Sequence, residues 1–249
     1  KNMKYVPLPE LQYFTSSCLD GAVIGDLILN GFIEAYTCKA DRSEAKLYKE
    51  VRAKVEKKIS NSPTIFTEKM ASSPLGPINH TSTIQLLVHL IGTLNSSMPD
   101  YDFSELQACD FVHCNNIDLV ANNINESFLN YALEAKLQGV RKKFWDILDS
   151  VIDLKKCSVY SFIPDDESEV FGEGKVWTMN YFFVNKSAKK IVLFMCSARR
   201  RISQMNMIEN ANDTAAEMSE DEMFECEIEA PLHYRKRTTI DLTQQSWVS

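Results

Sequence analysis

The sequence lacks the long apolar run that a membrane-spanning helix requires. Its longest apolar stretches are short, such as Ile191–Cys196, whereas a spanning helix needs roughly 18 apolar residues or more. The first residues, Lys1–Lys4, are not followed by the apolar segment of a secretory signal peptide. We therefore expect neither a membrane span nor a secretory signal.

Closely spaced cysteine pairs are also missing. The chain has seven cysteines, an odd number, and no C-x-x-C motif. This usage argues against a disulfide framework and fits a reducing compartment. There is no glycine-rich phosphate-binding loop either. Since 45% of the 249 residues are hydrophobic and 24% are charged, the composition is that of an ordinary globular protein.

Basic residues are absent from one long segment of the chain. Between residues 202 and 230 there are nine Asp and Glu residues and no Lys or Arg. Residues 1–201 carry equal numbers of acidic and basic residues, although the whole chain has a net charge of −7. The absence of net charge over residues 1–201 argues against non-specific DNA binding by this part of the chain. We expect residues 202–249 to form an acidic, mobile tail.

Amphipathic spacing predicts several helices. They lie within residues 1–20, over 41–60, from about Ile84 to the closing residues 95–97, from Ser104 to about Phe111, over 117–132 and over 140–152. The helix that closes at residues 95–97 is the most apolar, and Pro99 prevents its continuation. Ser104 and Gln107 have the spacing of a capping box, which predicts that a new helix begins there.

Three segments between residues 157 and 197 have the composition of strands. They cover residues 157–163, 176–184 and 191–197, and their short connections require antiparallel pairing. Asn30-Gly31 favours a hairpin, although one longer strand remains an alternative. We therefore predict an α/β (α+β) fold with a central antiparallel sheet of about four to five strands packed with amphipathic helices.

Three blocks of sequence together resemble one family. The blocks are F-I-E-A-Y-T-C-K (32–39) with K-L-Y-K (46–49); G-P-I-N (76–79), H-L-I-G-T-L-N-S-S (89–97) and P-D-Y-D-F-S (99–104); and W-T-M-N-Y-F-F-V-N-K (177–186) with K-I-V (190–192). They resemble the Maf-one family, the eukaryotic repressor of RNA polymerase III transcription. The resemblance implies one globular domain over residues 1–201, with a first block (1–58), a linker (59–76) and the second and third blocks (77–201).

The resemblance also implies a function without catalysis. Proteins of this family bind RNA polymerase III near its clamp and initiation-specific subunits and impede its recruitment to a TFIIB-like initiation factor. Regulatory kinases inactivate them by phosphorylation. We accordingly expect a monomeric, cofactor-free phosphoprotein of the nucleus and cytoplasm that represses tRNA and 5S rRNA genes, binds no membrane and reads no nucleic-acid sequence directly. The alternative is a ligand-sensing or scaffold α/β domain without a transcription role.

The segment Asp100–Ser104, here named the acidic corner, is the family's clearest signature in this chain. Its Asp100, Tyr101, Asp102 and Phe103 follow the apolar helix directly. A metal or phosphoryl-transfer role for the two aspartates has little support, because no phosphate-binding loop or third carboxylate accompanies them. We expect a structural corner in which an Asp is tied to the first block, with Lys39 as the candidate partner.

Two other clusters have competing interpretations. Cys109, His113 and Cys114 could indicate zinc, but a structural site needs four ligands, and a half-buried helix explains the cluster as well. The aromatic residues of strand 176–184 are predicted to be core on two covered faces rather than a stacking platform for RNA. A hydrolase is disfavoured, because no nucleophile, base and oxyanion group can be named.

The basic triplet Arg199-Arg200-Arg201 precedes Ser203. Arginines at this spacing suit a basophilic kinase, so Ser203 is a candidate phosphorylation site. The same triplet is a candidate nuclear localisation signal, and the alternative is a solvated strand end. The family that this chain resembles has two basic residues at the start of the apolar helix, and this chain has Ile84-Gln85 there. We therefore do not expect this chain to make the contacts that those two charges would make.

Overall fold

A computed structural model describes residues 3–38, 42–61, 73–129, 139–163, 174–201 and 235–236. Its contacts group the chain into two compact units. The first comprises Lys1–Tyr5, Tyr36–Val112 and Ala230–Ser249, and the second comprises Val6–Ala35 and His113–Glu229. Each unit is described separately below. The prediction of a single domain over 1–201 with a linker at 59–76 stays a prediction, and much of that linker lies outside the described residues.

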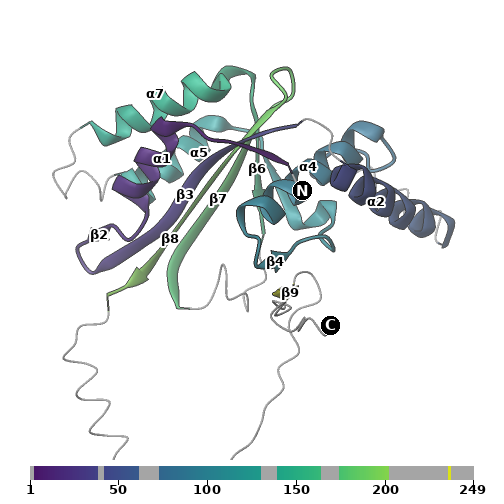
Figure 1. Ribbon diagram of the computed structural model, residues 1–249, viewed down its shortest axis with the longest axis horizontal. Helices are drawn as coiled ribbons and strands as arrows, with labels where there is room; N and C mark the ends of the chain where they lie inside the picture. Colours follow the sequence, from purple (N-terminus) through teal and green to yellow (C-terminus); the bar gives the residue numbers. More distant parts are fainter. Residues whose placement is uncertain are drawn as a thin grey trace, which may run out of the picture. The chain divides into compact units, whose positions relative to one another are not determined.

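A seven-stranded sheet forms the framework of the fold (Figure 1). Its strands follow the order β1-β3-β8-β7-β6-β5, and β2 pairs with β3 at one side. The strands are β1 (Lys4–Val6), β2 (Val23–Ile24), β3 (Leu27–Thr37), β5 (Phe111–Cys114), β6 (Ser158–Phe162), β7 (Lys175–Asn185) and β8 (Lys190–Arg200). Pairing of β6 with β7 and of β7 with β8 is antiparallel, as predicted from the short connections. The sheet exceeds the predicted four to five strands because β1, β2 and β5 have only two to four residues each.

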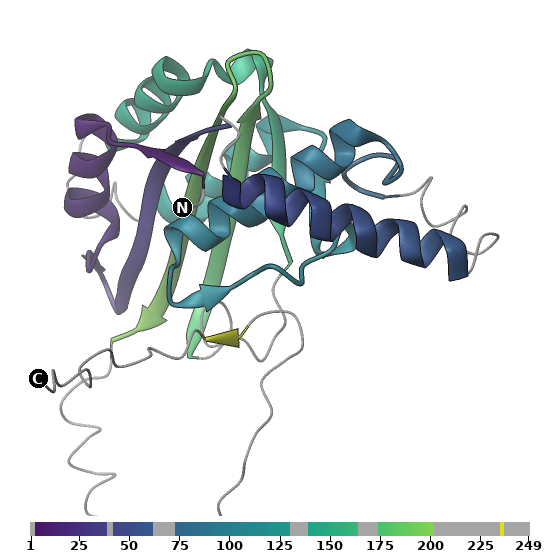
Figure 2. The same cartoon turned by 45° about the vertical axis from the view of Figure 1, so that its right-hand side comes forward.

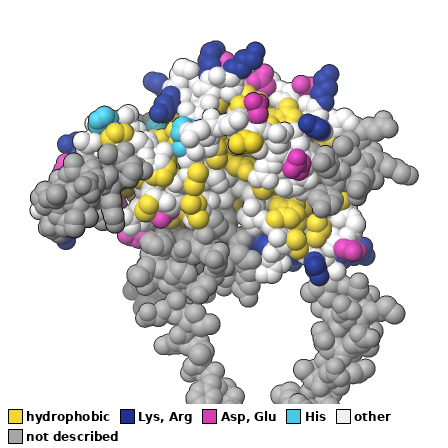
Figure 3. Space-filling view, turned by 180° about the vertical axis from the view of Figure 1, so that it is seen from behind, with side chains coloured by type: hydrophobic (Ala, Val, Ile, Leu, Met, Phe, Trp, Pro, Cys, Tyr) yellow, Lys and Arg dark blue, Asp and Glu magenta, His cyan; other side chains and the backbone are white. Residues whose placement is uncertain are grey.

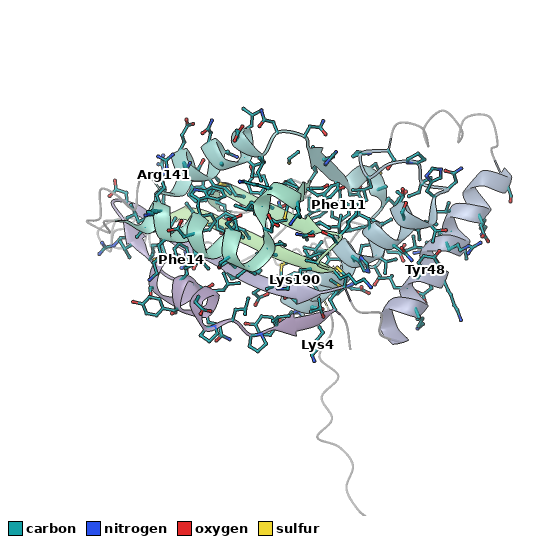
Figure 4. All side chains as sticks on the ribbon, turned by 90° about the horizontal axis from the view of Figure 1, so that it is seen from above. Lys4, Phe14, Tyr48, Phe111, Arg141 and Lys190 are labelled. Atoms are coloured by element: carbon teal, nitrogen blue, oxygen red, sulfur yellow. The ribbon has the colours of Figure 1, made fainter. Side chains whose placement is uncertain are left out.

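Helices of the second unit cover one face of this sheet. They are α1 (Pro9–Phe14), which continues as a π-helical turn Thr15–Leu19, α5 (Ile117–Ile124), continued by Asn125–Leu129, and α7 (Val140–Ile152). The Phe144 ring lies 5.4 Å from both the Phe14 ring and the Phe194 ring, measured between centroids, so α1, α7 and β8 meet in one aromatic core. Figure 4 labels Phe14 of this core. Burial of these apolar faces is the main favourable term in folding.

The first unit contains the two helices that precede the acidic corner. Helix α2 (Arg42–Asn61) and helix α4 (Thr81–Ser97) pack against each other (Figure 2). In α2 the amphipathic pattern predicted for residues 41–60 takes the form of a narrow apolar stripe, because Val51 and Val55 are buried while most of the described helix surface is charged and exposed. Helix α4 is buried over most of its surface, which explains its high apolar content.

Asn30-Gly31 does not form the predicted hairpin turn. Both residues lie inside β3, which runs without a break from Leu27 to Thr37. The turn into β3 instead contains Gly25, whose φ is +56°. A Cβ atom on Gly31 would lie 2.4 Å from the carbonyl oxygen of Met195 in β8. Glycine is therefore required here by the close approach of two strands, which is the other common meaning of glycine in a strand.

The helix predicted from Ser104 to about Phe111 is also absent. A single 3₁₀ turn, Ala108–Asp110, leads directly into β5. The strand prediction for β7 holds: both side-chain faces are buried from Met179 to Asn185, whereas Val176 at the start of the strand is 51% exposed. The predicted mobile tail lies outside the described residues, except for the short strand β9 (Arg235–Lys236).

No helix among the described residues is long and apolar enough to cross a membrane.

Candidate functional site: the acidic corner

Helix α4 carries the acidic corner on a buried apolar base. Leu90, Ile91 and Leu94 are completely buried. The hydroxyls in its last two turns are satisfied by the helix itself, because Ser96 Oγ donates to the Gly92 carbonyl at 2.7 Å and Thr93 Oγ1 donates to the His89 carbonyl at 2.8 Å. The serines of the N-S-S motif thus belong to α4, which ends at Ser97 as predicted.

Asn95 holds the corner in place. Its side chain is 6% exposed, and its amide oxygen accepts a hydrogen bond from the backbone N–H of Phe103 at 3.0 Å. Phe103 itself is completely buried. Tyr101 N–H donates to the carbonyl of Met98 at 3.1 Å, which closes the turn around Pro99. The sequence did not indicate this contact, because a hydrogen-bond donor eight residues away gives no spacing signal.

Asp102 forms a turn with Ser104, and the helix predicted to begin at Ser104 does not form. One Asp102 carboxylate oxygen, Oδ1, accepts both the Ser104 N–H at 3.1 Å and the Ser104 hydroxyl at 2.6 Å. This is the local side-chain turn that Asp commonly makes with the residue two positions later. The capping box predicted for Ser104 and Gln107 is therefore wrong. The box that exists pairs Gln107 with Asp110 and starts the 3₁₀ turn.

An ion pair connects the residue after the corner to the first block. Lys54 Nζ on α2 lies 2.7 Å and 2.8 Å from the two carboxylate oxygens of Glu105. Both side chains are about half exposed, so the pair contributes little free energy. The predicted partner Lys39 lies outside the described residues, and its contact with an aspartate of the corner stays a prediction. Nothing in the spacing of Lys54 and Glu105, which are 51 residues apart, could have indicated the pair.

Two asparagines of the third block have comparable structural roles. Asn180 on β7 is buried and makes a two-sided contact with Phe162 at the end of β6: its Oδ1 accepts the Phe162 N–H at 2.6 Å, and its Nδ2 donates to the Phe162 carbonyl at 2.9 Å. Asn185 donates to the carbonyl of Ile152 at 2.7 Å and accepts the N–H of Ala188 at 2.9 Å. These two side chains hydrogen-bond to backbone groups at the end of β6 and at the start of the turn after β7.

The sequence favours a half-buried helix as the explanation of the cluster Cys109, His113 and Cys114. The structure contradicts that explanation. Cys109 belongs to the 3₁₀ turn, and the other two lie on β5, where the His113 ring stacks on Tyr160 at 4.8 Å between centroids. Burial raises the pKa of the Cys114 thiol. Within the described residues, no group of three or more His, Cys, Asp or Glu side chains is placed to hold a metal ion.

The basic triplet lies at the exposed end of β8. Arg199, Arg200 and Arg201 are all exposed, and the Arg201 N–H donates to the Asp26 carbonyl at 2.7 Å. Lys175 lies opposite Arg199 in the sheet, and burial lowers its pKa. The candidate phosphorylation site Ser203 lies outside the described residues, so its role stays a prediction.

At the start of α4, Ile84 is 4% exposed and Gln85 is exposed. An unpaired basic side chain at position 84 would have to be buried, which is costly. The isoleucine of this chain therefore fits its core position, and only position 85 faces solvent.

The described residues define an α+β protein whose most elaborate polar feature is a rigid corner of the backbone. The chain belongs to the Maf1 regulator family, since that family's profile matches residues 29–195. It is 30% identical over 220 residues to the repressor of RNA polymerase III transcription maf1 of Schizosaccharomyces pombe, a match that covers 85% of this chain and 90% of that protein. It is 28% identical to the repressor of RNA polymerase III transcription of Dictyostelium discoideum, with 88% and 90% covered.

Solved structures show the same fold. The crystal structure of citrus MAF1 in space group P 31 2 1 superposes with a TM-score of 0.58 at 22% sequence identity, covering 77% of this chain and 99% of that chain. The predicted fold class, α+β with a central antiparallel sheet and packed helices, is confirmed by this likeness and by the strand order described above.

Proposed function

We propose that this protein represses transcription by RNA polymerase III. The observation that carries the proposal is the family match over residues 29–195, together with relatives that are named repressors of this polymerase and align over nearly their whole length. The protein acts by contact with other proteins and not as an enzyme.

The mechanism we propose is direct binding to RNA polymerase III, near its clamp and initiation-specific subunits. Bound protein impedes recruitment of the polymerase to the TFIIB-like initiation factor on the promoter. The neutral charge balance of residues 1–201 supports a protein surface as the partner rather than the phosphate backbone of nucleic acid. Figure 3 agrees with this balance on one face, where Lys and Arg side chains are interspersed with Asp and Glu along the upper edge.

Regulation is proposed to occur through phosphorylation at Ser203. A phosphate there would add about −1.5 to −2 charges two residues after three arginines. Because Arg199–Arg201 are exposed at the end of β8, a basophilic kinase could reach them. We further propose that the protein is a monomer that moves between cytoplasm and nucleus. Ser203→Ala should abolish phosphate incorporation by the kinase, and this variant should repress equally with and without the kinase. Unchanged phosphate incorporation would show that Ser203 is not the regulatory site.

Binding to the polymerase is tested by pull-down. The immobilised full chain should retain purified RNA polymerase III and not RNA polymerase II, and prior addition of the TFIIB-like factor should reduce retention. Retention of neither polymerase would contradict the proposed contact. Equal retention of both would show non-specific binding.

A further inference from the structure

Strand β9 connects the acidic corner to a distant basic segment of the same chain. The corner contributes the two-residue strand β4 (Tyr101–Asp102), and β9 pairs with it antiparallel. The register sets Tyr101 opposite Lys236 and Asp102 opposite Arg235. Figures 1 and 2 both show the two strands as neighbours. Both strands belong to the first compact unit.

The charges on the two sides of this pairing are opposite. Asp100, Asp102 and Glu105 place three carboxylates within six residues, and Lys54 is paired with Glu105. Strand β9 consists of Arg235 and Lys236, and the next residue in the sequence is Arg237. Residues of opposite charge that face each other directly across two antiparallel strands attract, whereas like charges repel.

The corner is also prepared for an added strand. Asn95 and the buried Phe103 fix the backbone after β4, and the Asp102–Ser104 turn fixes the next residue. A short, rigid strand with an open edge can accept an extended peptide through main-chain hydrogen bonds, with side chains providing specificity. The 33 residues between Arg201 and Arg235 span up to ~110 Å when extended, so chain length does not prevent the pairing.

We infer that β4 is a docking edge for a short basic strand, and that β9 (Arg235–Lys236) of the same chain is its occupant. This role is separate from the proposed repression and does not depend on it. It gives a role to the basic residues that follow the acidic run of residues 202–230. An external basic peptide would have to displace β9 to reach the corner.

The first test compares full-length variants by hydrogen exchange. Arg235→Glu/Lys236→Glu/Arg237→Glu should accelerate amide exchange over residues 100–104 by about tenfold, because the segment loses a pairing partner and opens more often. The control Arg141→Glu/Lys142→Glu/Lys186→Glu makes the same change in net charge at exposed positions of the second unit, and should leave this exchange unchanged. Equal rates in the wild-type chain and the first variant would overturn the inference, as would equal acceleration by the control.

The second test supplies the strand as a separate molecule. A labelled synthetic peptide of residues 231–241 should bind the Arg235→Glu/Lys236→Glu/Arg237→Glu chain saturably, and should bind the wild-type chain about tenfold more weakly because β9 already occupies the edge. Adding Asp100→Asn/Asp102→Asn to the first chain should weaken peptide binding, while Asn at position 102 keeps the side-chain oxygen that accepts from Ser104. Control substitutions Asp20→Asn/Asp146→Asn should not weaken it. Peptide binding that is insensitive to the corner substitutions would overturn the inference.

Discussion

At the scale of single residues, buried asparagine side chains hold backbone segments in position through hydrogen bonds. Asn95 holds Phe103, Asn180 pairs with Phe162, and Asn185 links the end of α7 to the turn after β7. All three asparagines are less than 7% exposed. They lie within the blocks that resemble the family, so these signature residues are explained by backbone contacts rather than by a partner.

Replacing Asn95 tests this explanation. Asn95→Leu keeps the size of the side chain but leaves the buried Phe103 N–H without its acceptor, which should lower the free energy of unfolding by about 1–3 kcal/mol. Urea denaturation followed by circular dichroism measures the change. Asn122→Leu on the exposed surface of α5 is the matched control and should change stability little. Equal stability of both variants would show that the Asn95 contact is not important for the fold.

His89 should make stability depend on pH. The residue lies on α4, and desolvation by burial lowers its pKa below the ordinary value of 6.5. Because the unfolded chain binds the proton more readily, the contribution of His89 is present above pH 6.5 and is lost as the pH falls through 6.5 towards the lower pKa of the folded state.

Denaturation at pH 7.5 and at pH 5.5 measures this dependence. The loss of stability between the two conditions should be smaller in His89→Gln than in the wild-type chain. His80→Gln, at an exposed position just before α4, serves as the control and should keep the full wild-type loss. A His89→Gln chain with the wild-type pH dependence would place the responsible group elsewhere.

At the scale of secondary structure, the sequence predicted elements well where a long periodic pattern was present. The positions of α2, α4, α7, β7 and β8 agree with the predictions within a few residues. The failures are short elements whose conformation is decided by contacts distant in sequence. Ser104 carries a capping-box spacing, yet its hydroxyl and N–H are both bound to Asp102. Asn30-Gly31 carries a turn signal, yet the neighbouring strand β8 determines the need for glycine.

Gly31 provides a direct test of that strand contact. Gly31→Ala places a Cβ atom 2.4 Å from the Met195 carbonyl oxygen, so the two strands must shift apart. Overpacking of this kind should cost about 1–3 kcal/mol in the free energy of unfolding. Asn30→Ala, one residue earlier and exposed, is the control and should cost much less. A Gly31→Ala chain as stable as the wild type would mean that β3 and β8 are separated more widely than described.

The ion pair between α2 and the residue after the corner can be measured by a charge swap. Lys54→Glu and Glu105→Lys should each lower the free energy of unfolding by about 0.2–1 kcal/mol, because both side chains are half exposed. The double swap should recover most of the loss, and the coupling should shrink in high salt. Absence of coupling between the two positions in low salt would rule out the pair. A parallel swap of Lys39 and Asp102 tests the contact that was predicted from sequence.

At the scale of the whole molecule, the fold class and the family could be read from the sequence, whereas the details of the site could not. The three resembling blocks fall on β3 and α2, on α4 and the corner, and on β7 and β8. The ion pair of Lys54 with Glu105, the residue after the acidic corner, and the pairing of β4 with β9 join residues 51 and more than 130 positions apart. Pairings over such distances depend on the folded backbone, and no local spacing rule encodes them.

The central claim is repression of RNA polymerase III, and its most direct test is transcription of a tRNA gene in a cell extract. Purified full-length protein, added in increasing amounts, should progressively reduce the tRNA transcript while an RNA polymerase II transcript in the same extract stays constant. Addition of purified RNA polymerase III should restore the tRNA transcript. An unchanged tRNA transcript at saturating, correctly folded protein, or an equal loss of both transcripts, would contradict the account.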